Sequence, residues 1–166
     1  MYIPVEVVGV RIEMPSNQPI LLLKEIEGSK FLPIWIGSNE ASAIAFAQQG
    51  INPSRPLTHD LIADLLDRTG VILTAVHITA LIDGVFHAEL ILRNETSALP
   101  PLSCRPSDAV AIALRSKSNI LVDLELLENA GIEIPEGVAP GSDGSGLDEV
   151  EAFKEFLDNI NPEDFA

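Results

Sequence analysis

Runs of apolar residues alternate along this chain with short segments of turn-forming residues. The runs are rich in valine, leucine and isoleucine, which is typical of strands with a buried face. They predict strands at residues 5–13, 20–26, 31–36, 71–82, 85–92 and 119–122, and a shorter one at 132–134. Asp83-Gly84 separates two of these runs and is a dipeptide typical of a tight hairpin turn. The pattern therefore predicts a sheet that contains hairpins.

Helices are expected where small and apolar residues recur with helical spacing, at residues 39–50, 58–69, 107–117 and 124–130. Asn39, Thr58 and Ser107 are residue types that cap helices. An acidic residue follows each of them within two positions, where its charge would complement the helix dipole. In the second helix the apolar residues are expected to share one face: Leu57, Leu61, Ile62, Leu65 and Leu66.

Two segments of the chain repeat each other at an offset of 68 residues. The helical segment that starts at Glu40 aligns with the one that starts at Asp108, and both carry alanines at the same positions. Without any gap, Pro33 then aligns with Pro101, and the apolar run at residue 3 aligns with the run at residue 71. We therefore expect an α+β fold made of internally duplicated β-β-β-α units, joined by the helix at 58–69.

The composition changes after residue 135. A glycine-rich segment at 136–146 is expected to be a flexible linker between a domain at 1–135 and an acidic helical tail at 147–166. Apolar residues recur in the tail with helical spacing: Leu147, Val150, Phe153, Phe156, Leu157 and Ile160. The tail should therefore form an amphipathic C-terminal helix, which needs a partner in this core or in another subunit.

The chain has a formal net charge of −15 at pH 7. Residues 123–166 hold 13 acidic residues and one basic residue, so most of this charge lies at one end and a local basic face elsewhere stays compatible with the total. No apolar run has the length of a membrane span. The single cysteine, Cys104, excludes an internal disulfide and suits core packing. We expect a soluble cytoplasmic protein without a membrane partner.

The densest cluster of chemically able side chains is Arg55, Thr58, His59 and Asp60. An arginine there could bind a phosphate, a histidine could transfer a proton near neutral pH, and an aspartate could hold a divalent cation or orient the imidazole. A structural interpretation is also open, in which Thr58 caps the helix, Asp60 complements its dipole and Arg55 pairs with a carboxylate.

Arg105, Ser107 and Asp108 allow the same two interpretations. They could belong to a site, or Arg105 and Asp108 could form an ion pair that holds the two repeats together. Glu40 aligns with Asp108 and shares both interpretations. The remaining histidines, His77 and His87, flank the Asp83-Gly84 turn and could face each other across the hairpin. We interpret them as a surface pair, because a metal site needs three convergent ligands.

Four motifs resemble those of the bifunctional nuclease family, long catalogued as a domain of unknown function. They occur in the family's order within a likeness that covers roughly residues 3–130: Leu32-Pro33-Ile34-Trp35-Ile36-Gly37, Glu40-Ala41, Arg55-Pro56-Leu57-Thr58-His59-Asp60 and Arg105-Pro106-Ser107-Asp108-Ala109. The resemblance implies an α+β domain, and some members of the family are described as degrading both RNA and DNA.

The resemblance therefore implies a nuclease that hydrolyses phosphodiester bonds in RNA and DNA. In that function His59 would be the base or proton donor. Asp60, Asp108 and Glu40 would be catalytic carboxylates that orient it or hold a divalent cation such as Mg or Mn. The phosphate would be bound by the remaining motif residues, which are Arg55, Arg105, Thr58 and Ser107.

The alternative is a non-catalytic regulatory or interaction module that binds a protein or an anionic ligand through the same arginines. It is favoured by the few basic residues and by the presence of only one tryptophan and one tyrosine for base stacking. In either case we expect a homodimer or a higher homo-oligomer.

Overall fold

The structure is a computed structural model, and it describes residues 1–134 of the 166-residue chain. The linker expected at 136–146 and the amphipathic helix expected at 147–166 lie outside the described residues. No helix in the described part is long and apolar enough to cross a membrane.

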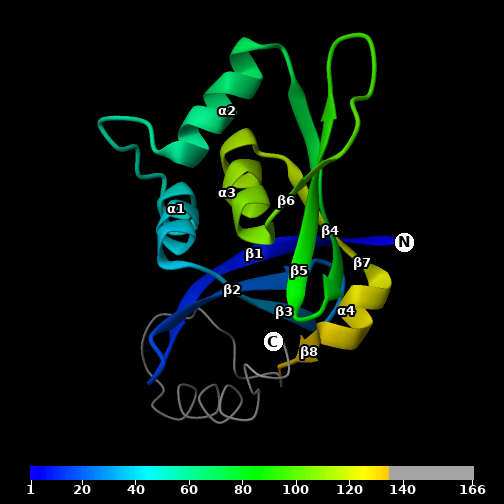
Figure 1. The fold of residues 1–166 in the computed structure, drawn as a ribbon. Coiled ribbons are helices and arrows are strands. Elements are labelled where there is room, and N and C mark those ends of the chain that lie inside the picture. Colours follow the sequence, from blue (N-terminus) through cyan, green and yellow to red (C-terminus); the bar gives the residue numbers. More distant parts are fainter. Residues whose placement is uncertain (135–166) are drawn as a thin grey trace.

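The described residues form an eight-stranded sheet with four helices, so the predicted α+β class is confirmed (Figure 1). The strands are β1 Tyr2–Glu13, β2 Gln18–Glu25, β3 Lys30–Trp35, β4 Ile72–Ile82, β5 Val85–Arg93, β6 Leu102–Cys104, β7 Asn119–Asp123 and β8 Ile132–Glu133. The helices are α1 Ser38–Gln49, α2 Thr58–Arg68, α3 Pro106–Ser116 and α4 Leu124–Ala130.

The strand order in the sheet is β6-β5-β4-β7-β1-β2-β3-β8. Strands β1 to β3 form one antiparallel meander and β4 to β6 form another, and each meander is followed by a helix, α1 or α3. Strand β7 lies between them, antiparallel to β1 and parallel to β4. Helix α1 follows β3 and α3 follows β6, which lie toward opposite edges of the sheet, yet the two helices pack against each other and a hydrogen bond from Arg105 to Glu40 joins their N-terminal ends.

Helices α1 and α3 lie side by side against the sheet, with α2 packed against α3, while α4 contacts β3, β4 and β7 and contributes to the same hydrophobic core (Figure 1). The alanines of α3 explain its close approach to the sheet. Ala109, Ala111 and Ala113 are buried together with Val110 and Ile112. Small side chains are therefore buried over most of the length of the helix. Close packing of this kind fixes the first turn of α3 relative to α1 and α2.

The apolar residues of α2 are not all buried on one face, although the sequence predicted that they share one. Ile62 and Leu66 pack against the core, whereas Leu57, Leu61 and Leu65 are exposed. The reason is that α2 touches the rest of the molecule along one narrow side, which it presents to α3. A stripe of three leucines therefore remains on the outer side of this helix.

The predicted N-caps were wrong. The capping positions are Gly37 for α1, Leu57 for α2 and Arg105 for α3, and none of them makes a side-chain capping hydrogen bond. At α3 the reason is Pro106, because its fixed φ suits the first helical position and moves the cap one residue back. The C-terminal end of α1 is as predicted, with Gly50 in the left-handed conformation at φ 66°.

His77 and His87 do not face each other. His77 lies opposite Glu89 and His87 lies opposite Ala80, because the two histidines are at different distances from the turn that joins β4 and β5. The His77 ring instead stacks on Tyr2 of β1 at a centroid distance of 4.0 Å.

Candidate functional site

Asp108, in the first turn of α3, is the centre of a cluster of charged side chains. Its Oδ1 accepts a hydrogen bond from His59 Nε2 at 2.8 Å, and its Oδ2 accepts one from Arg105 Nε at 2.7 Å. Arg105 Nη2 also donates to Asp108 Oδ1 at 3.1 Å and to Glu40 Oε1 at 2.8 Å. The cluster thus joins α1, α2 and α3 through four of the predicted site residues.

The hydrogen bonds keep Asp108 ionised. Burial raises the pKa of its carboxyl group, but the hydrogen bonds from Arg105 and His59 outweigh burial and lower the pKa below its ordinary value. Arg105 uses its Nε–H and both Nη2 hydrogens in these contacts, and its side chain is 65% exposed. The two N–H groups of Nη1 have no partner among the described residues, so a fixed guanidinium offers two donors to solvent.

The contact with Asp108 selects one tautomer of the neutral His59 imidazole. A carboxylate only accepts hydrogen bonds, so in that tautomer Nε2 carries the proton and Nδ1 carries the lone pair. The side chain of His59 is only 11% exposed, and Nδ1 has no partner among the described residues. Since no fully buried polar side-chain atom in this part of the chain lacks a partner, Nδ1 retains some accessible surface. It is therefore an accessible proton acceptor of the cluster when the imidazole is neutral.

A groove of about 930 Å³ runs between α1, α2 and β6, and we call it the His59 groove. Its lining includes the apolar residues Phe46, Leu57, Ile62 and Leu102. It also includes Thr58 and the hydrogen-bonded cluster of Glu40, His59, Arg105 and Asp108. An apolar cleft with a few convergent polar groups is the usual form of a ligand site.

Cys104 also lines the groove. Burial raises the pKa of its thiol to about 11, with further contributions from the charges of Asp108 and Glu89. A thiol with such a pKa is protonated at neutral pH and is a poor nucleophile. Its packing role agrees with this environment.

Asp60 lies outside the groove lining and binds a different arginine. Its Oδ1 accepts from Arg115 Nε at 2.5 Å, and its Oδ2 accepts from the backbone N–H of Leu57 at 2.9 Å. Burial raises the pKa of Asp60, but the bonds from Arg115 and Leu57 lower it by more. Arg115 Nη1 and Nη2 donate to the backbone oxygens of Ala111 and Ala43. Asp60 thus helps to hold three helices together.

The sequence-based prediction missed Arg115. The signal was present, because Arg115 follows Asp108 by seven residues and so lies two turns further along the same side of α3. Adjacent residues of α2, His59 and Asp60, bind this pair. Together the two contacts form what we call the α2–α3 clamp.

The other predicted phosphate contacts are divided. Thr58 is exposed and lines the His59 groove. Arg55 is exposed on the loop before α2, outside the groove lining, and has no ion pair among the described residues. Ser107 is 6% exposed and lines a separate cavity beside the N-terminal end of α3.

The donor set around Asp108 does not fit a divalent cation. The described residues contain no group of three or more His, Cys, Asp or Glu side chains placed to hold a metal ion. The carboxylates of Glu40 and Asp108 are both hydrogen-bonded to Arg105, whose positive charge would oppose a second cation there. We therefore assign no chemical step to a metal.

Comparisons with known proteins give the family. The model of the bifunctional nuclease domain matches residues 21–135. An uncharacterized protein of Mycobacterium tuberculosis is 51% identical over 162 residues, which cover 97% of this chain and 96% of that protein. Bifunctional nuclease 1 of Arabidopsis thaliana is 28% identical over 137 residues, 78% of this chain and 42% of its own. Bifunctional nuclease 2 of Oryza sativa subsp. japonica is 29% identical over 128 residues, which cover 75% of this chain and 39% of that protein. The chain spans less than half the length of these plant relatives.

Proposed function

The chain belongs to the bifunctional nuclease domain family, and from this premise we propose that it hydrolyses phosphodiester bonds of RNA and DNA in the His59 groove. One observation carries the proposal. A histidine with an accessible ring nitrogen, oriented by Asp108, lies beside an arginine with two unused donors at an open groove. These are the two groups that phosphodiester hydrolysis needs, a base and a cation.

In this mechanism His59 Nδ1 takes a proton from a water molecule as the water oxygen attacks phosphorus. The bond from phosphorus to the leaving oxygen breaks, and that oxygen takes a proton from solvent or from the imidazolium. Asp108 stabilises the imidazolium, and Arg105 Nη1 donates to the phosphate oxygens as their charge increases. Because water is the nucleophile, the mechanism does not need a 2′-hydroxyl and serves RNA and DNA alike.

Asp60 has another role in this proposal than the sequence suggested. It does not line the groove, and its carboxylate is taken up by Arg115 and Leu57. We assign it the positioning of α2, which carries His59. Glu40 similarly orients Arg105 through the bond at 2.8 Å.

The test measures the cleavage of end-labelled single-stranded RNA and DNA in three separate conditions, which are added Mg, added Mn and added chelator. Glutamine at position 59 keeps an N–H donor for Asp108 but has no basic nitrogen, so His59→Gln should lower cleavage by roughly 10²- to 10⁴-fold while the melting temperature stays close to wild type. His87→Gln is the matched control and should cut at the full rate. Cleavage by His59→Gln at the rate of wild type would contradict the proposal.

The second candidate is a non-catalytic module that binds an anionic ligand through Arg105. The α2–α3 clamp favours it, because the same contacts of His59 and Asp60 would be needed merely to dock α2. If wild type cuts neither substrate under any condition, this candidate is preferred. Loss of polyanion binding in Arg105→Ala would then be the decisive measurement.

We also propose that the two β-β-β-α units descend from an internal duplication. The capping residues Gly37 and Arg105 are separated by the repeat offset of 68, and so are the pairs Val7–Leu23 and Ala75–Ile91. A homodimer remains part of the proposal. The exposed leucines of α2 support it, since a two-fold axis would place the same stripe on both partners.

A further inference from the structure

The His59 groove has an apolar lining that the core of the fold does not use. Phe46 of α1 lines it and is half-buried, but it is not among the partly buried side chains that pack against the core cluster. Leu57, which precedes α2, is 37% exposed, and Leu102 of β6 is 55% exposed. Three elements thus bring apolar surface to the groove that also holds the charged cluster around Asp108. Apolar surface beside convergent polar groups indicates a ligand rather than a packing role.

Phe46 shares one side of α1 with polar groups. Asn39, Ser42 and Phe46 follow one another at spacings of three and four residues, so they lie along the same side of the helix. Asn39 and Ser42 are exposed, and all three residues line the groove. A flat ring that stacks on Phe46 would therefore have a hydroxyl and an amide on the same side of the helix. A nucleobase fits this combination, because it stacks on its faces and forms hydrogen bonds at its edge.

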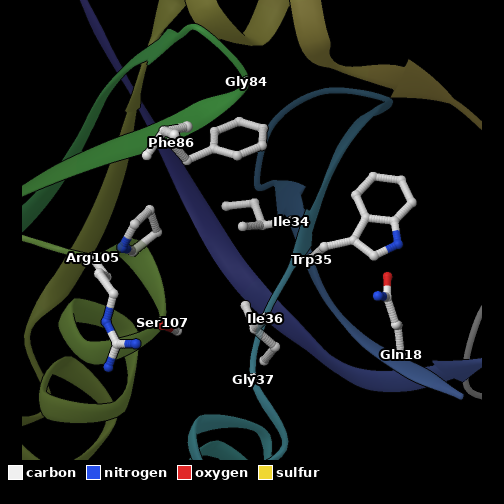
Figure 2. A pocket seen from close by; sticks show the side chains of 11 residues that line it. Gln18, Ile34, Trp35, Ile36, Gly37, Gly84, Phe86, Arg105 and Ser107 are labelled. Atoms are coloured by element: carbon white, nitrogen blue, oxygen red, sulfur yellow. The ribbon is translucent and has the colours of Figure 1, made fainter. Parts of the chain in front are cut away.

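The charges of the groove suit one phosphate rather than a row of them. Arg105 is the only arginine or lysine among the described residues that line it, and the two N–H groups of its Nη1 are unused. The carboxylates of Glu40 and Asp108 outnumber this single guanidinium, so several phosphates would be repelled. In Figure 2 the side chain of Arg105 extends away from Phe86, which lines the separate cavity beside α3. The guanidinium is therefore directed toward its partners in the groove.

The positions for a phosphate and for a base are close enough for one nucleotide. Glu40 binds Arg105 at 2.8 Å, and Phe46 follows Glu40 by six residues, which is about 9 Å along the helix axis. A single nucleotide can span this distance. A duplex keeps its bases paired and stacked, so it could offer a ring to Phe46 only by taking a base out of the stack.

We propose that the His59 groove binds an unpaired base next to the bond that is cut, with its ring against Phe46 and its phosphate at Arg105. The substrate is then single-stranded RNA or DNA, and Phe46 is the residue that determines this specificity. The inference rests on the proposed nuclease function, since it names the substrate class of the same site. The groove volume of about 930 Å³ leaves room for a base and its phosphate.

The test measures binding rather than cleavage, with the full-length His59→Gln protein, which should leave the strand intact. Three fluorescein-labelled probes of about ten nucleotides are compared by fluorescence anisotropy. They are a single-stranded DNA, the same DNA annealed to its complement, and a strand of abasic units that keeps the phosphates but has no bases. The single strand should bind at least about tenfold more tightly than either of the other probes, because only it offers unpaired bases.

Substitutions of Phe46 in the same protein test the ring itself. Phe46→Leu keeps apolar volume but removes the ring, so it should weaken binding of the single strand about fivefold or more and leave binding of the abasic strand unchanged. Phe46→Tyr keeps the ring and should bind like its parent. Phe86→Leu is the matched control, because Phe86 is also half-buried but lines the cavity in Figure 2 instead of the groove, and it should bind like its parent.

A further variant keeps the test decisive if the loss of the Phe46 ring disturbs folding. Asn39 is exposed and lines the groove on the same side of α1. Asn39→Ala should therefore leave the melting temperature unchanged and still reduce the preference for the single strand over the abasic strand.

The outcomes separate this inference from the proposed function. Equal affinity for the single strand and either of the other probes would overturn the base site even if wild type cuts RNA. An equal loss for the single and abasic strands in Phe46→Leu would overturn it too. A preference for the single strand that Phe46→Leu and Asn39→Ala reduce and Phe46→Tyr retains would support the base site even if no cleavage is found.

Discussion

Asp60 and Asp108 are both carboxylates close to His59, but their surroundings give them different tasks. Asp108 lines the groove and binds the imidazole at 2.8 Å, so it acts on the one side chain that can move a proton. Asp60 binds a nearly buried arginine and a backbone N–H away from the groove. Residue type and sequence position do not distinguish these roles. The partner of each carboxylate does, which is the imidazole of His59 for Asp108 and the guanidinium of Arg115 for Asp60.

The pH dependence of stability should reveal both carboxylates. Burial raises their pKa values, but hydrogen bonds from arginine and other donors outweigh it, so both pKa values lie below the ordinary 3.8. A carboxyl group with a lower pKa in the folded state stabilises the fold above its unfolded pKa, and this contribution disappears as the pH falls through the folded pKa. We therefore expect it to be complete above about pH 5 and to decline below about pH 4.

Urea unfolding of wild type and Asp60→Asn at several pH values between neutral and acid checks this expectation. The difference in unfolding free energy between the two proteins should be largest at neutral pH and should shrink in acid, because wild type then loses what the variant already lacks. Using the difference removes the contribution of the other carboxyl groups. A difference that is constant with pH would contradict the lowered pKa of Asp60.

At the scale of elements, the α2–α3 clamp explains how a helix with an exposed leucine stripe stays in place. Helix α2 is amphipathic, yet only Ile62 and Leu66 pack against the core. The clamp adds charged contacts at its first turn, where His59 and Asp60 reach Asp108 and Arg115. The orientation of His59 in the groove therefore depends on contacts outside the groove.

Arg115→Met tests this dependence. The substitution keeps most of the apolar stem but removes the ion pair with Asp60 and the bonds to Ala111 and Ala43. It leaves a partly buried carboxylate unpaired, so unfolding in urea should show a loss of about 2 to 4 kcal/mol. Arg68→Met on α2 is the control, since Arg68 is exposed and has no ion pair in the described part. The double variant with Asp60→Asn should be less than additive, and full additivity would contradict the pairing.

The sequence predicted the elements well because their signals are local. The periods of strands and helices placed all four helices and every strand except β6, Leu102–Cys104, which no apolar run predicted, and Gly50 ended α1 where expected. Helix starts were less predictable, since Pro106 competes with Ser107 for the start of α3. Arg115 was missed for a different reason. Its partner Asp60 is 55 residues away, so the contact depends on how two helices cross.

The same limit applies to the site as a whole. Glu40, His59, Arg105 and Asp108 were candidates because each residue type suits the chemistry, and the repeat aligned two of them. The sequence could not separate Asp60 from this set, or show that Arg105 lines two cavities. Both depend on how α1, α2 and α3 pack against one another in space.

For the molecule as a whole, the net charge of −15 opposes the binding of a polyanion. Affinity for nucleic acid would therefore have to come from local groups such as the two unused donors of Arg105. Residues 138–166 contain eight acidic residues and one basic residue. They should weaken the binding of nucleic acid at low salt, where charges act over longer distances.

Truncation after Gly137 tests this effect together with the independence of the domain. The described residues already form a closed core between the sheet, α3 and α4, so the shortened chain should keep a cooperative thermal transition. It should also bind single-stranded RNA more tightly than the full chain at low salt, and the advantage should vanish at high salt because surface charges are then screened.

A full-length variant with the same eight acidic residues changed to amides is the control, and it should reproduce the gain. Light scattering on each protein reports the oligomeric state. A truncated chain that unfolds or precipitates would mean that the removed residues cover apolar surface, and a gain that persists at high salt would mean that they block the groove by contact rather than by charge.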